Sequence, residues 1–145
     1  RITEGERLKE DLFDKLDGMI RDVDAIEDRY PQIMTEYREK LTLKVEELLG
    51  DAQMEEGRIA AEVILFADKI CTDEETVRLR SHIESMREEL LSGGSVGRKL
   101  DFLAQEMNRE ANTILSKAND LETSNRAINL KTEIEKVREQ IQNIE

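Results

Sequence analysis

Apolar residues recur along the chain at steps of three and four, which is the period of one face of an α-helix. The first run predicts a helix that ends before Pro31, because proline lacks a backbone donor and disfavours helix in the residue before it. A second run predicts another helix up to about Gly50. These two helices either fold back as a hairpin or continue as a kinked rod. Their apolar stripes are Leu12, Leu16, Met19, Val23, Ile26 and Tyr30, followed by Ile33, Tyr37, Leu41, Val45 and Leu48.

The rest of the chain predicts four further amphipathic helices. One starts near Glu55, and the next starts at Thr72 or Asp73. The fifth begins at Gly97, after the SGGS segment of residues 92–95, because adjacent glycines are costly to hold in a helix. The sixth covers the C-terminal end. Their stripes are Ile59, Val63, Phe66 and Ile70; Leu79, Ile83, Met86 and Leu90; Leu100, Leu103, Met107, Ala111, Ile114 and Ala118; and Ala127, Leu130, Ile134, Val137, Ile141 and Ile144.

All six predicted helices need partners, because most of the stability of an amphipathic helix comes from covering its apolar face. Helix-forming residues dominate the 145-residue chain, so little sequence remains for strands. Aromatic residues make up 3% and charged residues 39%, which favours elongated helices over a compact globular core. We therefore predict an all-α fold of elongated helical hairpins and coiled-coil segments with a small C-terminal helical bundle. Its predicted parts are a stalk over residues 1–54 and a helical domain over residues 55–145.

Charge and cysteine content narrow the kinds of function. The net charge of −12 opposes nonspecific nucleic-acid binding, since phosphate contacts usually need clustered lysine and arginine. The acid is concentrated: residues 1–97 carry 14 basic and 25 acidic side chains, whereas residues 98–145 carry 8 and 9. A single cysteine excludes an internal disulfide, and with a single histidine it excludes a structural Cys/His zinc site. No apolar run reaches the length of a membrane span, so we expect no membrane partner.

One candidate group of chemical residues lies on the fifth predicted helix. Glu106 and Glu110 are four residues apart, so a helix points both carboxylates the same way, at a spacing that one or two hard cations can bridge. Arg109 lies beside them, and the amide of Asn112 could hold a phosphate oxygen or a water. The same spacing also fits a solvated helix face with ordinary surface pairs.

A second candidate group lies on the fourth predicted helix, where Glu75, Arg78 and His82 share one face. An imidazole and a carboxylate at this spacing can share a metal ion, or act as a general acid and base near neutral pH. The alternative is structural: Glu75 completes a capping box begun by Thr72, and His82 is a residue at the edge of the core.

Several segments together resemble the C-terminal half of the YicC/YloC family of bacterial endoribonucleases. The QEMNRE segment at residues 105–110 and the RLRSH segment at residues 78–82 are similar to family signatures. The resemblance extends over FADKICTDEE at residues 66–75, GRKLDFLAQEMNREANTILSKAND at residues 97–120, and the closing KTEIEKVREQIQNIE at residues 131–145. It implies that the N-terminal half of a longer protein is absent from this chain and that residues 55–145 are the catalytic domain.

The resemblance implies a metal-dependent endoribonuclease of the bacterial cytoplasm that acts on RNA as a homo-oligomer, such as a hexamer. Oxygen ligands with one imidazole favour Mg²⁺ or Mn²⁺ as the divalent metal. The implied catalytic residues are Glu75, Arg78, His82 and Arg109; the implied metal ligands are Glu75, His82, Glu106 and Glu110; the implied RNA contacts are Arg98, Lys99, Asn112, Lys117 and Lys131.

Two reaction routes and two other functions remain open on the sequence. Either a metal-activated water attacks the phosphate, with Arg78 or Arg109 stabilising charge on its oxygens, or a ribose 2′-hydroxyl attacks with His82 as the base. The heptad stripes would equally suit a non-catalytic coiled-coil scaffold. An RNA-binding regulator that does not cut is the second rival.

Overall fold

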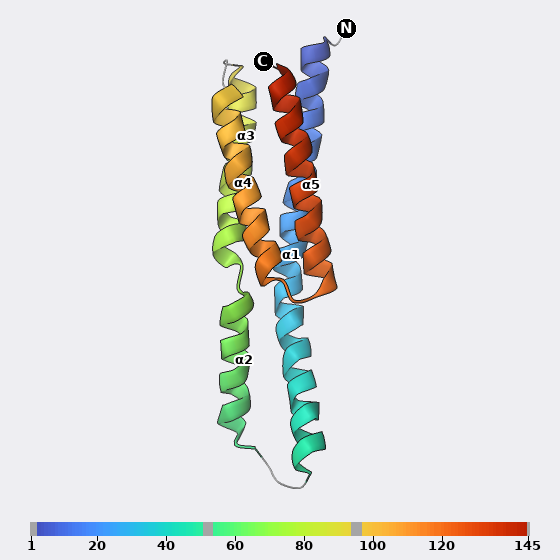
Figure 1. Ribbon diagram of the computed structural model, residues 1–145, viewed down its shortest axis with the longest axis vertical. Coiled ribbons are helices and arrows are strands. Elements are labelled where there is room, and N and C mark those ends of the chain that lie inside the picture. The colour runs from blue at the N-terminus through green and yellow to red at the C-terminus, as the bar shows by residue number, and fades with distance from the viewer. Residues whose placement is uncertain (1–2, 51–53, 94–96, 145) are drawn as a thin grey trace.

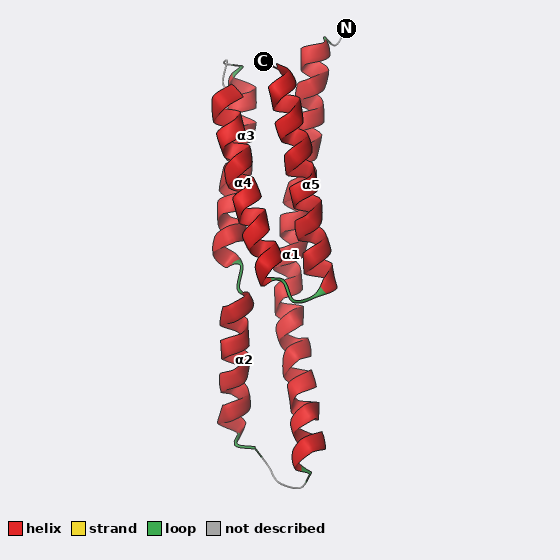
Figure 2. Ribbon diagram, in the orientation of Figure 1, coloured by secondary structure: helices red, strands yellow, loops and turns green. Residues whose placement is uncertain are grey.

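Residues 3–50, 54–93 and 97–144 are described in the computed structural model, and they form five α-helices. These residues contain helices, turns and loops but no strand, which confirms the all-α prediction (Figure 2). The helices are α1 (Glu4–Leu49), α2 (Glu56–Ile70), α3 (Asp73–Ser92), α4 (Gly97–Lys117) and α5 (Leu121–Ile144).

Four of the helices form an antiparallel bundle in which the first half of α1, α3, α4 and α5 surround one core. Each packs against two neighbours, in the order α1, α3, α4, α5 and back to α1 (Figure 1). Polar contacts fix the level of α5 on α1, since Asp22 pairs with Arg126 at 3.1 Å and Arg29 with Asp120 at 3.0 Å. On the other side of α1, Arg80 of α3 is paired with carboxylates of α1.

The predicted apolar stripes build this core. In the bundle, the residues of the predicted stripes are less than 9% exposed. The exceptions are Tyr30 and Ala118, and the side chain of Ile144 lies outside the described part of the chain. Burying one such large side chain contributes about 1.5–3 kcal/mol. The core consists of Leu12, Leu16, Met19, Val23 and Ile26 from α1, Leu79, Ile83, Met86 and Leu90 from α3, Leu100, Leu103, Ala104, Met107, Ala111 and Ile114 from α4, and Ala127, Leu130, Ile134, Val137 and Ile141 from α5.

The predicted break at Pro31 is wrong, because α1 is one helix of 46 residues with Pro31 inside it. Pro31 cannot donate to the carbonyl of Glu27, but the apolar stripe runs through it in register. Contacts on both sides hold the helix: Arg29 donates to both carboxylate oxygens of Glu36, at 3.1 and 2.7 Å, and Tyr30 is anchored to α2. Of the two sequence alternatives, the chain therefore continues as a rod and does not turn back at Pro31.

The second half of α1 and all of α2 extend beyond the bundle as an antiparallel pair (Figure 1). We call residues 31–49 together with α2 the arm. The Tyr37 and Phe66 rings stack with centroids 3.8 Å apart, and the Tyr30 hydroxyl donates to the Ala67 carbonyl at 2.8 Å. After Ile70 the chain resumes as α3, which continues toward the bundle end. The first half of α1 thus belongs to the bundle core and its second half to the arm, while the division into residues 1–54 and 55–145 stays a prediction.

Replacing Pro31 with alanine should raise the free energy of unfolding by about 1–3 kcal/mol, because alanine restores the donor to Glu27 and has the best helix propensity. Urea unfolding of this chain followed by circular dichroism measures the change. The exposed Glu39→Ala substitution on the same helix is the control, and it should change stability by less than about 0.5 kcal/mol. A loss of stability in Pro31→Ala would contradict a continuous α1.

Candidate active site on helices α3 and α4

Helices α3 and α4 run antiparallel, and three ion pairs across them define their register. Glu75 pairs with Lys117 at 2.7 Å, Arg78 with Glu110 at 2.8 Å, and Glu89 with Lys99 at 2.6 Å. The pairs succeed one another along the two helices, so each step up α3 corresponds to a step back along α4. All of the catalytic and metal-binding residues predicted from the sequence lie on these two helices.

The Arg78–Glu110 pair joins a buried carboxylate to a half-exposed guanidinium. Glu110 is 5% exposed although it is charged, and Arg78 Nε donates to its Oε2. The hydrogen bond to Glu110 raises the pKa of Arg78 above its usual value. A second carboxylate, Glu74, lies 3.6 Å from the same guanidinium. Glu110 is therefore fixed by Arg78 and is not a solvated surface residue.

The Glu75–Lys117 pair closes the end of the α3–α4 interface nearest the arm. Glu75 is 3% exposed, and Lys117 Nζ donates both to its Oε1 at 2.7 Å and to the Cys71 carbonyl at 3.0 Å. The hydrogen bond to Glu75 raises the pKa of Lys117. The buried Oε2 of Glu75 has no hydrogen-bond partner among the described residues. The proposed capping box is absent, because Thr72 makes no side-chain bond to the start of α3.

His82 and Glu106 lie on the next step of the same register. Four residues forward from Arg78 and four residues back from Glu110 lead to this pair, so the two residues share one level of the antiparallel helices. Both side chains are half-buried, and neither forms a side-chain hydrogen bond to another described residue. From the helix register we infer that an imidazole and a carboxylate lie one turn from the Arg78–Glu110 ion pair.

The remaining candidates are more scattered. Arg109 and Asn112 of α4 are exposed, as are Arg98 and Lys99 at the start of that helix. Two of the predicted RNA contacts already have partners on α3: Lys99 pairs with Glu89, and Lys117 pairs with Glu75. Lys131 lies on α5, which packs against α4 and α1 and is diagonal to α3.

The predicted metal ligands do not form a metal site in this arrangement. Throughout the described parts of the chain, no three side chains of histidine, cysteine, aspartate or glutamate are grouped so that they could hold a metal ion. The two buried carboxylates, Glu75 and Glu110, each already have a cationic partner from the chain itself. The set Glu75, His82, Glu106 and Glu110 therefore does not fit a divalent metal as it stands.

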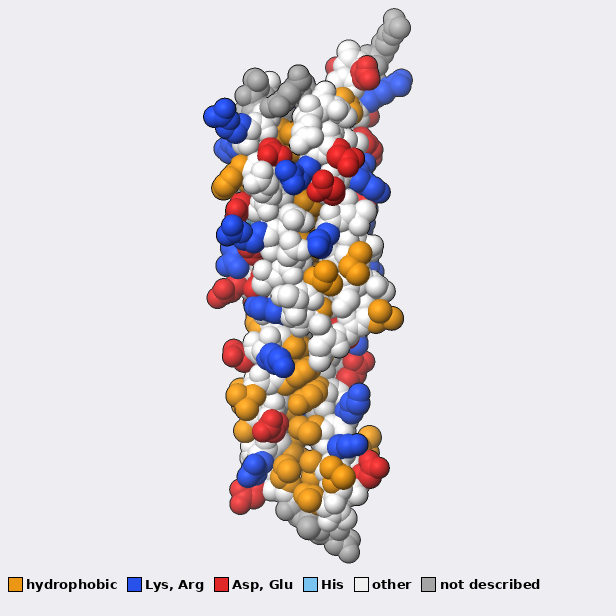
Figure 3. Space-filling view, viewed as in Figure 1, with side chains coloured by type: hydrophobic (Ala, Val, Ile, Leu, Met, Phe, Trp, Pro, Cys, Tyr) orange, Lys and Arg blue, Asp and Glu red, His pale blue; other side chains and the backbone are white. Residues whose placement is uncertain are grey.

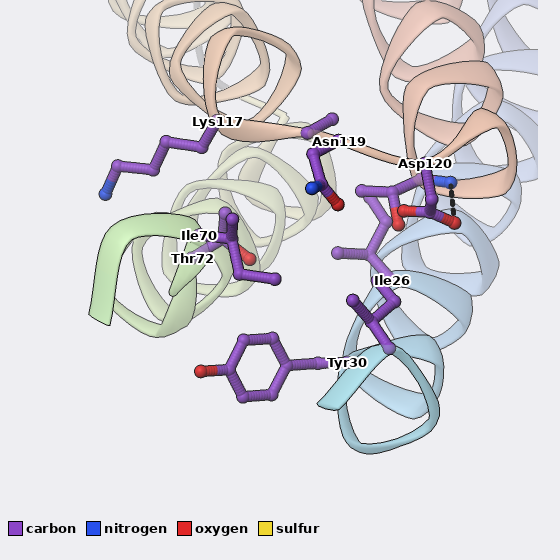
Figure 4. A pocket seen from close by; sticks show the side chains of 10 residues that line it. Ile26, Tyr30, Ile70, Thr72, Lys117, Asn119 and Asp120 are labelled. Atoms are coloured by element: carbon purple, nitrogen blue, oxygen red, sulfur yellow. Dashed lines mark hydrogen bonds between the residues drawn. The ribbon is translucent and has the colours of Figure 1, made fainter. Parts of the chain in front are cut away.

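A small cavity lies under the turn between α4 and α5, close to Lys117 (Figure 4). Its volume of ≈ 10 Å³ has room for about one water. Asp120 Oδ1 and Thr123 Oγ1 are buried there without hydrogen-bond partners among the described residues. Sequence analysis missed this cavity: the break in the apolar period around Asn119 marks the turn, but the Tyr30 and Ile70 walls come from distant segments.

Asp120 is the polar link between this turn and α1. Burial alone would raise its pKa, but hydrogen bonds from Thr123 and Arg29 outweigh burial and hold the pKa below its usual value. The Thr123 backbone N–H donates to Asp120 at 3.3 Å, which caps the start of α5. The α4–α5 turn is thereby tied to the point where the arm leaves the bundle.

By its fold and its candidate site, the chain is an all-α bundle domain in which buried carboxylates form ion pairs across one helix interface. Residues 26–145 match the family described as "Endoribonuclease YicC-like, C-terminal". The chain is 45% identical over 146 residues to a probable endoribonuclease YicC of Clostridioides difficile, and 38% identical over 145 residues to one of Haemophilus influenzae. Each alignment covers 100% of this chain and 50% of the relative, so the chain spans about half the length of these relatives. The chain belongs to the YicC-like family.

No helix in the described parts of the chain combines the length and the apolar character needed to cross a membrane.

Removing the guanidinium of Arg78 while Glu110 remains should lower the free energy of unfolding by about 1–3 kcal/mol, because a buried carboxylate loses its partner. Arg78→Gln and Glu110→Gln, alone and combined, form the cycle, measured by urea unfolding. The double variant should recover part of the loss, since the neutral amide that replaces the Glu110 carboxylate carries no charge to bury. Arg109→Gln removes an exposed arginine from α4 as the control. Equal losses for Arg78→Gln and Arg109→Gln would contradict a structural ion pair.

Acid should weaken the link made by Asp120. Its folded pKa lies below the unfolded value, so the ionised carboxylate stabilises the fold above pH about 4 and this stabilisation is lost as the pH falls through the folded pKa. The difference in unfolding free energy between the wild type and Asp120→Asn should therefore be constant near neutral pH and should shrink below pH about 4. A difference that grows on acidification would refute this sign.

Proposed function

We propose that this chain is the catalytic part of an endoribonuclease that cleaves RNA phosphodiester bonds in the bacterial cytoplasm. Membership of the YicC-like family and the names of two relatives support the reaction class. The observation that carries the proposal for this chain is the shared level of His82 and Glu106 beside the Arg78–Glu110 pair. Such a row offers a proton acceptor, a carboxylate and a guanidinium on one strip of surface.

In the proposed reaction, His82 accepts the proton of a ribose 2′-hydroxyl near neutral pH. The 2′-oxygen then forms a bond to the adjacent phosphorus, the bond from phosphorus to the 5′-oxygen breaks, and the leaving oxygen takes up a proton from water. Glu106 stabilises the imidazolium that His82 becomes. The exposed Arg109 stabilises the charge on the phosphoryl oxygens, because guanidinium forms bidentate bonds to phosphate. The Arg78–Glu110 pair, in which only the carboxylate is buried, fixes α3 against α4 and so positions His82. Attack by a water is the other route, and it gives a different product end.

A divalent metal stays a prediction. Mn²⁺ or Mg²⁺ would supply Lewis acidity at the phosphate if the ligands were completed elsewhere in the full-length protein. Cleavage by full-length protein that has been stripped with EDTA and then supplied with Mn²⁺ or Mg²⁺ measures the requirement. Undiminished cleavage in EDTA would refute metal dependence without affecting the proposed site.

A homo-oligomer is the proposed form of the active enzyme, and RNA is its proposed partner. The acidic surface of this chain is a poor match for RNA, so we assign much of the RNA binding to residues outside it. Arg98, Lys99, Asn112, Lys117 and Lys131 remain proposed contacts. The rival function is a non-catalytic interaction module, which the exposed apolar residues of the arm favour.

His82→Gln and Glu106→Gln in the full-length protein should each reduce RNA cleavage by about 100-fold or more, because positioned acid–base groups contribute 10²–10⁴-fold. Glu139→Gln, an exposed acid of α5, is the control and should leave the rate unchanged. The rate is measured on a labelled hairpin RNA under single-turnover conditions, with binding measured separately. Binding without cleavage in the wild type would favour the regulator, and full activity in both variants would rule out the proposed site.

The product ends distinguish the two chemical routes. Attack by the 2′-hydroxyl leaves a 2′,3′-cyclic phosphate, and a single 2′-deoxy nucleotide at the cleavage position should then abolish cleavage there. Attack by water tolerates the 2′-deoxy nucleotide. Mass spectrometry of the products identifies the product ends. Cleavage of the 2′-deoxy substrate at the same rate as the all-ribose substrate would contradict His82 as the base for a 2′-hydroxyl.

A further inference from the structure

The arm carries an apolar face that no described helix of this chain covers. In the bundle, α4 and α5 lie over α1 and α3. The turn that joins α4 to α5 lies where the arm begins, so neither helix extends over the arm (Figure 1). Over the arm, the same side of the molecule shows apolar side chains gathered along α1 and α2 (Figure 3). The uncovered face continues the bundle core. The helical stripes supply its half-buried residues Tyr37, Leu41, Val45, Ile59, Val63 and Phe66, with Leu48 71% exposed near the tip.

The size of the face indicates what can cover it. The 15 residues of α2 span about 22 Å, and two adjacent helices are about 20 Å wide, so the face measures on the order of 450 Å². Covering it from both sides buries roughly 900 Å², close to the 1,000 Å² that a specific interface needs. A single helix would leave half of the face in water. The occupant should therefore be a pair of helices with an apolar face of the same length.

We propose that the arm docks on the arm of a second copy of this chain, so that the two arms complete an antiparallel four-helix bundle. The arm is itself a pair of helices of the right length, and a two-fold interface needs only one self-complementary surface. Helices α4 and α5 already occupy this side of the bundle, so the second copy approaches with its bundle pointing the opposite way. Its α1 then lies antiparallel to α1 of the first copy.

Charges along α1 match this arrangement when the arms overlap fully. Each arm tip, near residue 48, then reaches the start of the other arm, near residue 28, and the two-fold axis passes level with Arg38. Glu36 of one copy comes level with Lys40 of the other, and symmetry repeats the pair. Gln32 likewise comes level with Lys44. Lys40 and Lys44 are exposed, and Glu36, which pairs with Arg29 of its own helix, is 59% exposed and can accept a second cation.

The inference takes from the proposed function only its homo-oligomer, and it is independent of RNA cleavage. The measurement is the mass of the full-length protein by sedimentation equilibrium over a range of concentrations. A wild-type oligomer that does not cleave RNA would count against the nuclease site alone. Loss of mass without loss of cleavage would support the arm interface alone.

Leu48→Glu should weaken the association by at least about tenfold, or halve the number of subunits, because it places a charge at the contact. Leu43→Glu is the matched control, since Leu43 is 65% exposed on the same helix but lies off the apolar stripe. It should keep the wild-type mass. Circular dichroism verifies that both variants remain helical.

An unchanged mass for Leu48→Glu would overturn the interface, and so would an equal loss of mass in both variants. A lower melting temperature at unchanged mass would show that another segment of the same polypeptide covers the face, which also overturns the proposal. Lys40→Glu provides a test that leaves the apolar face intact. It should weaken association at low salt and much less at high salt, because the expected contact with Glu36 is exposed and screened. No effect at low salt would contradict the proposed register.

Discussion

Burial of the α1 stripe against α3, α4 and α5 is the constraint on which the rest of the structure depends. Met19 and Val23 are fully buried at the centre of α1, and each faces helices that come from the far half of the chain. Every helix is amphipathic, so none is stable until the stripe of another covers it. The short connections after α3 and α4 leave antiparallel neighbours as the available packing. That packing in turn fixes the level at which α3 and α4 meet.

The α3–α4 register determines which polar side chains of the candidate site lie side by side. A shift of one turn would place Glu110 away from Arg78 and leave a buried carboxylate without a partner, at a cost of about 1–3 kcal/mol. The ion pair therefore reinforces the register that the apolar packing sets. His82 and Glu106 share a level only in this register. The proposed reaction consequently relies on an ion pair that never needs to touch RNA.

Periodicity predicted the apolar core well because core positions depend on local spacing alone. Leu79, Ile83, Met107 and Ile134 are all 0–1% exposed, as their stripes required. The helix end predicted at Pro31 is wrong, since the helix-breaking tendency of proline is a local preference that packing on both sides overrides in α1. Glu75 shows what local spacing cannot predict. Its sequence neighbours suggested a cap with Thr72, but its partner is Lys117, whose proximity depends on the register of another helix. Spacing along one helix likewise does not reveal which cations lie across from the predicted metal ligands, so the lysine and arginine partners of Glu75 and Glu110 were not predicted.

The central claim is that RNA is cleaved on the strip of α3 and α4 that carries His82, Glu106 and Arg109. A crystal structure of the full-length protein with an RNA blocked by a single 2′-O-methyl group at the cleavage position tests it most directly. The account predicts that the scissile phosphate lies over this strip, with His82 within hydrogen-bonding reach of the blocked 2′-oxygen. A scissile phosphate bound on another face, or between domains that exclude α3 and α4, would contradict it.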